Sequence, residues 1–371
     1  MKIRELGVRM GELPCGRYNA ITDVEGVRVG HSTIIRDSGR EVEGVVRTGV
    51  TAIIPSDDIV SNPLYAGTFS LNGNGELCGC HWIEESGLLS TPVALTNTHS
   101  LGVVRDAMIR YYYERGKANP SYWMLPVVGE TWDGWLSDIN GMHVRPEHLY
   151  EALDSAASGP VAEGCVGGGT GMILHEFKGG IGTSSRVLPK ERGGYTVGVL
   201  VQGNYGRRGD LVIDNVPVGR HIPTSRIPGK EQGPPLVSPK EDGSIIIVVA
   251  TDAPLTADQC KRLARRAAIG LARTGSIGAD SSGDIFLAFS TANRLGDGNG
   301  TAPVAVAALP HGGMDNLFLA TIEATHEAIV NALCAAVTTT GIFGRRMYAL
   351  PLEEVRSLLE RYGKCGKRTQ L

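Results

Sequence analysis

Residues 243–250 read Gly-Ser-Ile-Ile-Ile-Val-Val-Ala, and this stretch carries the strongest structural signal in the chain. Its five consecutive β-branched residues suit a pleated strand. A strand with one face in water would alternate apolar and polar residues, whereas this run has no polar residue after Ser244. We therefore predict a strand over 244–250 that is buried on both faces, deep inside a layered fold.

The segments on either side of this strand differ sharply. Upstream, residues 222–243 contain five prolines, several charges and little apolar periodicity, which is typical of a surface linker or a mobile loop. Downstream, Thr256 and Gln259 have the spacing of a capping box, which predicts a helix running through Arg273. A second apolar stretch, at 282–289, predicts another strand.

Helical and strand patterns alternate through the rest of the chain. A capping serine, Ser100, and apolar residues at helical spacing predict a helix over 100–116, and Pro146 is well placed to open another. The remaining predictions are strands at 27–35, 50–55, 195–202 and 302–309, a glycine-rich turn at 165–172 and a long helix at 314–337. This order favours an α/β or α+β architecture without internal repeats.

Composition excludes several classes of protein. The 371 residues carry 36 Lys and Arg against 39 Asp and Glu, a formal net charge of −3, so no basic excess is available to bind nucleic acid. No apolar run approaches the ~18 residues of a membrane span, and we expect no membrane partner. Fifty glycines, close to twice the usual ~7%, indicate many sharp turns and close backbone approaches.

Cysteine and histidine spacing gives no metal signal. Cys78 and Cys80 are the one close pair among seven scattered cysteines, and an isolated C-x-C is poor spacing for zinc. The first residues are too polar for a secretory signal. We therefore expect a cytoplasmic protein with no metal and no organic cofactor.

Familiar catalytic motifs are missing, but the junction at Gly243-Ser244 suggests another chemistry. The sequence holds no G-x-S-x-G, P-loop, dinucleotide fingerprint or H-E-x-x-H. Cleavage before Ser244 would place a free α-amine, with a reference pKa of about 7.7, beside its hydroxyl, and such a pair is an activated nucleophile. Taken alone, Gly-Ser before a strand is more often a plain turn.

The same junction resembles the processing site of the P1 (S58, DmpA-type) aminopeptidases, the group of L-aminopeptidase/D-esterases and β-peptidyl aminopeptidases. Together with the proline-rich linker, residues 243–255 match that site. Other matching segments follow in family order from about residue 15 to 350. They are Asn19–His31, Ser70–Glu76, Pro126–Thr131, Lys178–Arg186, Val201–Gly206, Arg273–Ser276, Gly283–Asn293 and Glu323–Ile329.

The resemblance implies a fold and a maturation step. The fold is a single αββα four-layer sandwich, shared with ornithine acetyltransferase and similar to the N-terminal-nucleophile hydrolases. Self-cleavage at Gly243-Ser244 would give an α chain of residues 1–243 and a β chain of residues 244–371, which assemble as oligomers of such pairs. The implied activity is release of N-terminal residues from small peptides, amides or esters.

Family roles carry over to four residues of this sequence. Ser244 would be both the cleavage site and the catalytic nucleophile. Ser282 matches a second serine beside the nucleophile, and Asp284 matches the carboxylate two residues later. On a strand, residues 282 and 284 point to the same face and can converge on one site. Asn204 matches the side-chain amide that helps to form the oxyanion hole.

Three further residues are candidates for substrate binding. Glu130 matches an acidic residue that meets the substrate ammonium, a natural pairing in a partly buried pocket. Trp132 and Trp135 could wall that pocket, although at least one of them is expected to be a core residue. Two alternatives stay open: an N-acyl transferase of the ornithine acetyltransferase type, and an unprocessed, non-catalytic scaffold of the same fold.

Overall fold

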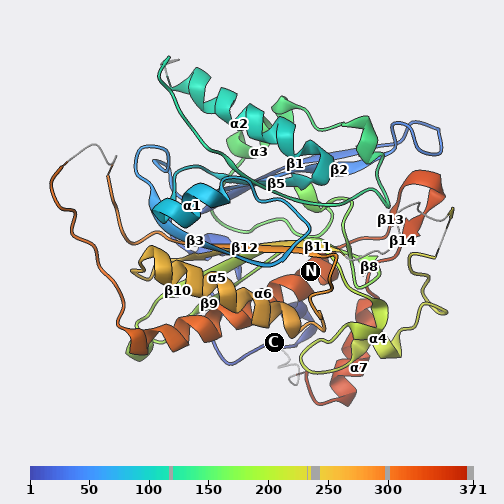
Figure 1. Ribbon diagram of the computed structural model, residues 1–371. Coiled ribbons are helices and arrows are strands. Elements are labelled where there is room, and N and C mark those ends of the chain that lie inside the picture. Colours follow the sequence, from blue (N-terminus) through green and yellow to red (C-terminus); the bar gives the residue numbers. More distant parts are fainter. Residues whose placement is uncertain (117–119, 232, 235–242, 297–300, 366–371) are drawn as a thin grey trace.

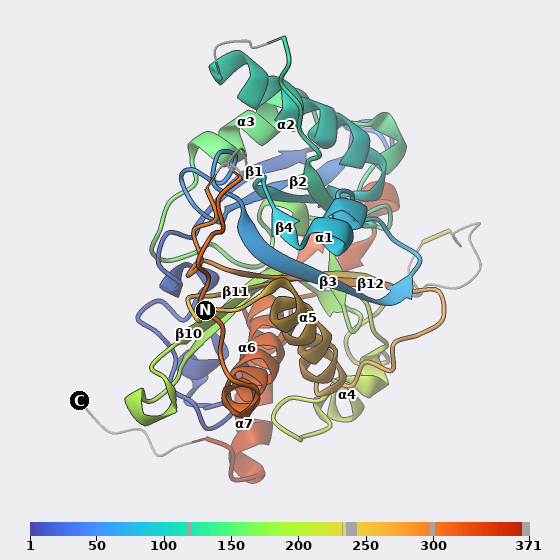
Figure 2. The same ribbon diagram turned by 60° about the vertical axis from the view of Figure 1, so that its left-hand side comes forward.

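The computed structural model describes residues 1–116, 120–231, 233–234, 243–296 and 301–365. Two β-sheets lie face to face, and helices cover the outer face of each, which gives four layers (Figure 1). Turning the molecule shows the same layers from the side, with α2 and α3 at one end of the stack and α5 and α6 at the other (Figure 2). The αββα fold expected from the sequence is confirmed.

The smaller sheet has four strands among the described residues. Their order is β1 (Arg28–Arg36), β2 (Val46–Ile54), β5 (Val93–Asn97) and β6 (Val127–Thr131). On its outer face, α2 (Leu101–Arg115) and α3 (Pro146–Asp154) bury a core of apolar side chains that includes Val50, Val104 and Leu149. The helices predicted at 100–116 and after Pro146 are therefore present and cover this sheet.

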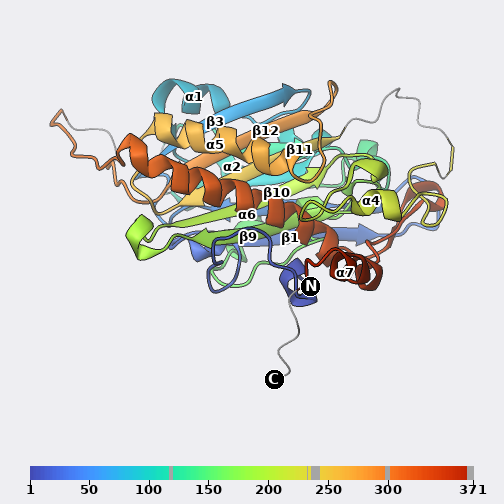
Figure 3. The same ribbon diagram turned by 90° about the horizontal axis from the view of Figure 1, so that it is seen from below.

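The larger sheet has six strands within the described ranges. Their order is β4 (Leu88–Leu89), β3 (Leu64–Gly73), β12 (Gly283–Ser290), β11 (Ser244–Thr251), β10 (Thr196–Asn204) and β9 (Gly180–Val187). Helices α5 (Ala257–Ala272) and α6 (Met314–Ala335) lie side by side across its outer face (Figure 3). Smaller elements are α1 (Cys80–Ser86), α4 (Val218–His221), α7 (Leu352–Arg361) and the hairpins β7–β8 (Ile173–Leu174, Phe177–Lys178) and β13–β14 (Thr339–Thr340, Arg346–Met347).

Strand β11 lies in the middle of the molecule, as its composition predicts. All eight of its residues are buried. Ile245, Ile247 and Val249 pack into the core under α5 and α6. Ile246 and Val248 belong to the core between the two sheets. Because successive side chains of a strand point to opposite faces, a run of β-branched residues fills both cores, and the predicted burial on both faces is confirmed.

The connection from β11 to β12 makes these two strands start at the same end of the sheet. These strands are parallel, so the chain must cross over between them, and it does so through α5. The Thr256 N–H donates to Gln259 Oε1 at 3.1 Å, as the sequence predicts for the start of this helix. Ser244 and Gly283 consequently begin neighbouring strands at the same edge.

Helix α6 is apolar enough to raise the question of a membrane. In the described part of the chain, one helical stretch, His311–Ala335, has the length and composition to cross a bilayer, yet 89% of its most apolar window is buried in the molecule. The central helix of a protein core meets the same criteria. Here α6 packs on β9 and β10, which explains its apolar character.

One predicted strand is wrong. Residues 302–309 form no strand, and they extend away from the body of the molecule (Figure 1, left, orange). Val304 and Val306 are 57% and 44% exposed. Alternating Val and Ala satisfy a strand pattern, but a strand also needs a partner edge, and none of the described strands pairs with this segment. This segment is attached to the body of the molecule at its last residue, where the Leu309 N–H donates to Pro254 O at 3.0 Å.

The proline-rich segment 222–243 lies partly outside the described residues. Its described residues before 235 form turns without a helix or strand, in agreement with the absence of apolar periodicity. Gly243 is described, and it enters β11 directly.

Candidate active site

Four predicted site residues meet at one edge of the larger sheet. Ser244, the first residue of β11, is paired with Asn204 at the end of β10 and with Gly283 at the start of β12. Ser282 and Asp284 flank Gly283, so they lie beside this row of paired residues. We call the row formed by Asn204, Ser244 and Gly283 the rung of Ser244. Residues up to 80 positions apart in sequence are thereby gathered around the Gly243–Ser244 peptide bond.

The carbonyl of Gly243 accepts two hydrogen bonds. Ser282 Oγ–H donates to Gly243 O at 2.6 Å, and the Gly283 N–H donates to the same oxygen at 3.2 Å. Two donors aimed at one carbonyl oxygen polarise it and stabilise the negative charge that develops when a nucleophile attacks its carbon. The carbonyl concerned belongs to the peptide bond that the sequence predicts to be cut.

The backbone around Gly243 leaves no room for a side chain. A Cβ on this residue would lie 1.7 Å from Asn204 O and 2.3 Å from the Cα of Tyr205. Backbone atoms cannot move aside as a flexible side chain can, so glycine is required for this approach. The close packing holds the Gly243 carbonyl in place against the end of β10.

Ser282 also contacts the carboxyl group of Asp284. The two side chains are 2.7 Å apart, and Asn72 Nδ2 donates to the second carboxyl oxygen at 2.9 Å. This contact confirms that residues 282 and 284 point to the same face. Burial raises the pKa of Asp284, although the hydrogen bonds from Ser282 and Asn72 oppose that shift.

Proton counting shows what this arrangement can do. A serine hydroxyl has one hydrogen to donate, but Ser282 Oγ has two acceptors within reach, Gly243 O and Asp284 Oδ1. When Asp284 is protonated, its hydroxyl can donate to Ser282 Oγ. The Ser282 hydroxyl then keeps its own hydrogen bond to the Gly243 carbonyl oxygen. A raised pKa for Asp284 favours this relay, which can pass a proton toward the scissile bond.

The amide of Asn204 is held in one orientation. Its Oδ1 accepts a hydrogen bond from the Ile173 N–H at 2.9 Å, and only the oxygen end of an amide can accept. The two Nδ2 hydrogens therefore point away from Ile173. Asn204 is also the residue paired with Ser244 in the sheet. This orientation is the one an oxyanion-hole amide requires, and the assignment of Asn204 to that hole stays a prediction.

Glu130 approaches the same rung from the smaller sheet. The residue is only 3% exposed; its Oε1 accepts from the Glu76 N–H at 2.9 Å, and its Oε2 accepts from the Thr98 hydroxyl. A Cβ placed on Gly75 would lie 3.3 Å from Glu130 Oε1 and 3.1 Å from Gly283 Cα, so one glycine separates the carboxylate from the rung of Ser244. Burial raises the pKa of Glu130, and the hydrogen bonds lower it.

The two tryptophans form part of a small core cluster. Trp135 is 2% exposed and packs with Leu136, Ile173 and Met347. Trp132 is half-buried against the same cluster. Trp135 is thus a core residue, as expected for at least one of the pair. A pocket-wall role for Trp132 stays a prediction.

The end of β3 and the loop that follows it contribute contacts that the sequence did not predict. Asn72 holds Asp284, the Asn74 N–H donates to Ser282 O at 3.3 Å, and the Glu76 N–H holds Glu130. In the sequence, the segment 70–76 matches the family but indicates no role in the site. Its alternation of Asn and Gly at the end of a strand was the available signal, because these residues make tight turns with side chains free to donate.

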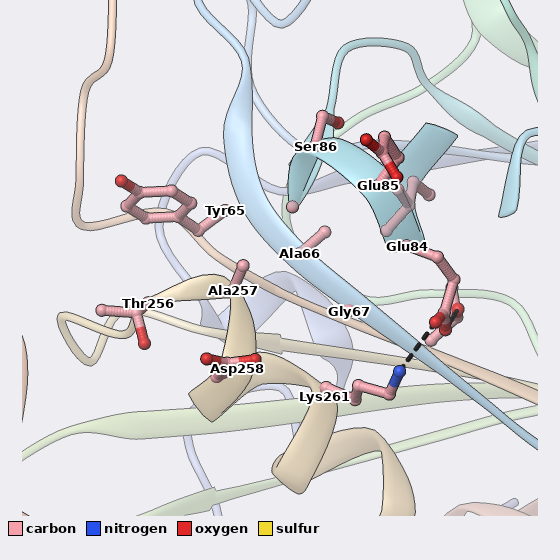
Figure 4. A pocket seen from close by; sticks show the side chains of 13 residues that line it. Tyr65, Ala66, Gly67, Glu84, Glu85, Ser86, Thr256, Ala257, Asp258 and Lys261 are labelled. Carbon is pink, nitrogen blue, oxygen red and sulfur yellow. Dashed lines mark hydrogen bonds and ion pairs between the residues drawn. The ribbon is translucent and has the colours of Figure 1, made fainter. Parts of the chain in front are cut away.

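The surface has two hollows that could hold a substrate, and one of the two borders the predicted site residues. One, of about 490 Å³, is lined by Gly243, Ser282 and the neighbouring loops that follow β10 and α5. The other, of about 710 Å³, lies between α1, β3 and the start of α5, where Lys261 pairs with Glu84 at 2.7 Å (Figure 4). The second hollow is larger, but none of the predicted site residues lines it. The hollow at the scissile bond is therefore the candidate active site.

Comparisons with known proteins agree on one group of enzymes. A model of peptidase family S58 matches residues 19–347. The β-peptidyl aminopeptidase BapA of Sphingosinicella microcystinivorans is 46% identical over 98% of this chain and 93% of its own. A solved β-aminopeptidase from a Burkholderia species has a TM-score of 0.89 at 47% identity, covering 98% and 99% of the two chains. The L-aminopeptidase D-Ala-esterase/amidase of Ochrobactrum anthropi, described as a variant of the Ntn hydrolase fold, has a TM-score of 0.88 at 43% identity over the same shares.

Proposed function

Because this chain belongs to peptidase family S58 and is an aminopeptidase of the N-terminal-nucleophile fold, we propose that it cuts itself between Gly243 and Ser244 and then uses Ser244 as its nucleophile. The family resemblance found in the sequence is confirmed, and the comparisons do not favour the acyltransferase alternative. The observation that carries the proposal is the Gly243 carbonyl, held between the Ser282 hydroxyl and the Gly283 N–H.

Self-cleavage follows from that carbonyl in two steps. Ser244 Oγ attacks the carbon of Gly243 and gives up its proton, while the developing oxyanion keeps its hydrogen bonds to Ser282 and Gly283. The C–N bond to Ser244 then breaks, its nitrogen takes the proton that the Ser244 hydroxyl gave up, and an ester joins Gly243 to Ser244 Oγ. Water hydrolyses the ester, which leaves a carboxylate on Gly243 and a free amine on Ser244.

The same groups serve the peptidase reaction. The new α-amine, with a reference pKa of about 7.7, accepts the proton of the Ser244 hydroxyl as it attacks the substrate carbonyl. The Asn204 amide donates to the tetrahedral oxyanion. The pair of Ser282 and Asp284 supplies a proton to the departing amine. Water then releases the acyl group from Ser244.

Substrate choice rests on Glu130. Its carboxylate, one glycine away from the rung of Ser244, would bind the ammonium of an N-terminal residue and set that residue's carbonyl at the nucleophile. Two relatives, at 46% and 47% identity, are named for β-peptide or β-amino substrates, so we include β-amino residues among those released. Assembly of αβ pairs into oligomers and a cytoplasmic location stay predictions.

Replacing Glu130 with glutamine should weaken the use of substrates that carry a free amine. A charge-assisted hydrogen bond of about 1.5–3 kcal/mol is lost, which corresponds to a fall of about 10- to 100-fold in kcat/KM. Rates on β-alanyl and L-alanyl p-nitroanilide, compared with the N-acetylated forms, measure this effect. The parent enzyme should prefer the free amine, and Glu130→Gln should lose that preference.

The pH dependence of KM gives a second readout. Burial raises the pKa of Glu130, and only the ionised form attracts an ammonium. As pH falls, KM should therefore begin to rise at a higher pH than the ~4.3 of an ordinary glutamate would give. In Glu130→Gln that acid-side rise should vanish. Exposed Glu114 on α2 is the matched control, and Glu114→Gln should behave as the parent; an unchanged preference for free amines in Glu130→Gln would contradict the role of Glu130.

A further inference from the structure

A fully buried lysine belongs to the β7–β8 hairpin, which contacts Asn204. Lys178, at the end of β8, is 0% exposed. Its Nζ donates to the carbonyl oxygens of Met172 and Gly179, each at 2.8 Å, and to that of Gly169 at 3.4 Å. An ammonium group has three N–H donors, and its acceptors here are these backbone carbonyls together with the neighbouring Cys165 side chain.

A charge in this position is costly, which calls for an explanation. Removing an ammonium from water carries a desolvation penalty of several kcal/mol, and burial lowers the pKa of Lys178. Carbonyl dipoles offset part of that cost. An apolar side chain would avoid it altogether, so the lysine must contribute something that an apolar side chain cannot.

One of the three carbonyls connects Lys178 to the candidate active site. Met172 O and the Ile173 N–H belong to the same peptide group. Lys178 binds the oxygen of that group, and the N–H of the group donates to Asn204 Oδ1 at 2.9 Å. A peptide group is planar, with its C=O and N–H in opposite directions. Holding the oxygen therefore fixes the direction of the N–H that orients Asn204.

The hairpin gives this connection a rigid frame. Ile173 and Lys178 are directly opposite each other in the β7–β8 pair. The Gly179 N–H also donates to Met172 O, at 3.0 Å, so that oxygen accepts hydrogen bonds from two donors. A positive charge on a carbonyl oxygen polarises the peptide group and strengthens its N–H as a donor. The Ile173–Asn204 hydrogen bond benefits in both geometry and strength.

We propose that Lys178 is a positioning residue, which fixes the Met172–Ile173 peptide and through it turns the Asn204 amide hydrogens toward the oxyanion formed at Ser244. The inference rests on the proposed function, because it gives Lys178 an effect only where Asn204 stabilises the transition state. It predicts that replacing Lys178 lowers kcat without changing the affinity for substrate.

A double-mutant cycle between Lys178 and Asn204 tests the proposal. Lys178→Met keeps the length of the side chain and removes the donors. We expect kcat on an alanyl p-nitroanilide to fall about 10- to 100-fold with KM within about twofold, somewhat less than the ~10²–10³-fold typical of losing an oxyanion donor outright. In the Asn204→Ala background, Lys178→Met should change kcat by less than about twofold, because the amide it positions is gone.

Stability controls and alternative outcomes separate the interpretations. Val104→Ala, in the core under α2, is a matched packing variant that should lower the melting temperature without lowering kcat at 25 °C. If Lys178→Met does not fold, Lys178→Gln, which keeps two donors, enters the same cycle with the same expectation of non-additivity. Additive losses in the two backgrounds, or a change confined to KM, would overturn the role of Lys178. Full kcat in Asn204→Ala alone would instead overturn the proposed role of Asn204.

Discussion

Replacing Ser244 with alanine is expected to reduce amide hydrolysis to the background rate, a loss on the order of 10⁶-fold. Two effects combine in this variant. The attacking hydroxyl is missing, and without it the bond before residue 244 stays intact, so the α-amine that would serve as base is never formed. Release of p-nitroaniline from an alanyl p-nitroanilide, followed over hours at high enzyme concentration, measures the loss.

A chemical control distinguishes loss of the nucleophile from damage to the fold. Ser244→Cys keeps a nucleophilic atom at the same position and should retain cleavage and part of the activity, whereas Ser244→Ala should show neither. Both variants fill the same buried site at the start of β11 and should melt together cooperatively. Appreciable turnover by Ser244→Ala would show that another residue is the nucleophile.

Replacing Ser282 with alanine is expected to slow self-cleavage by about 10²–10³-fold, the usual cost of losing one oxyanion donor. The variant removes the 2.6 Å hydrogen bond to Gly243 O and breaks the link from that oxygen to Asp284. The Gly283 N–H remains, so cleavage should be slow and not absent. The rate is the disappearance of full-length chain on denaturing gels after purification.

The control for this variant is another serine of the same sheet. Ser70 lies on β3, and its hydroxyl donates to Asn72 O at 3.2 Å, away from the Gly243 carbonyl. Ser70→Ala should process at the parental rate. If Ser282→Ala also processed at that rate, its hydroxyl would have no part in cleavage, and the arrangement around Gly243 would be only structural.

Much of the fold could be predicted because local patterns and tertiary packing agree. The β-branched run of β11 fills a core on each side of the sheet. An uninterrupted apolar run is enough to predict that both faces of the strand are buried. The capping pair of Thr256 and Gln259 marks the start of α5 for a reason contained within one helical turn. The convergence of Ser282 and Asp284 follows from the two-residue period of a strand.

Features that depend on distant partners could not be predicted in the same way. Residues 302–309 have a strand pattern, but the presence of a neighbouring edge is a property of the whole fold. The grip of Asn72 on Asp284 joins residues more than 200 positions apart. Lys178 reads as an ordinary charged residue, and only the folded hairpin shows that it binds the peptide group that orients Asn204.

The assignment of Trp135 illustrates a second limit. An aromatic residue near a proposed ammonium site fits both a pocket wall and a core, since its size suits either role. Burial among Leu136, Ile173 and Met347 settles the matter for Trp135. Sequence spacing contains no information about which side of a loop faces the core.

The measurement that tests the central claim most directly is the intact mass of the purified protein under denaturing conditions. The account predicts two chains, residues 1–243 and residues 244–371, with the smaller one beginning at Ser244, and masses that sum to the 39.4 kDa chain plus one water. Ser244→Ala, measured beside it, should remain whole. A single uncut 39.4 kDa chain in an active parental preparation would contradict the account, because Ser244 would then have no free amine and could not act as an N-terminal nucleophile.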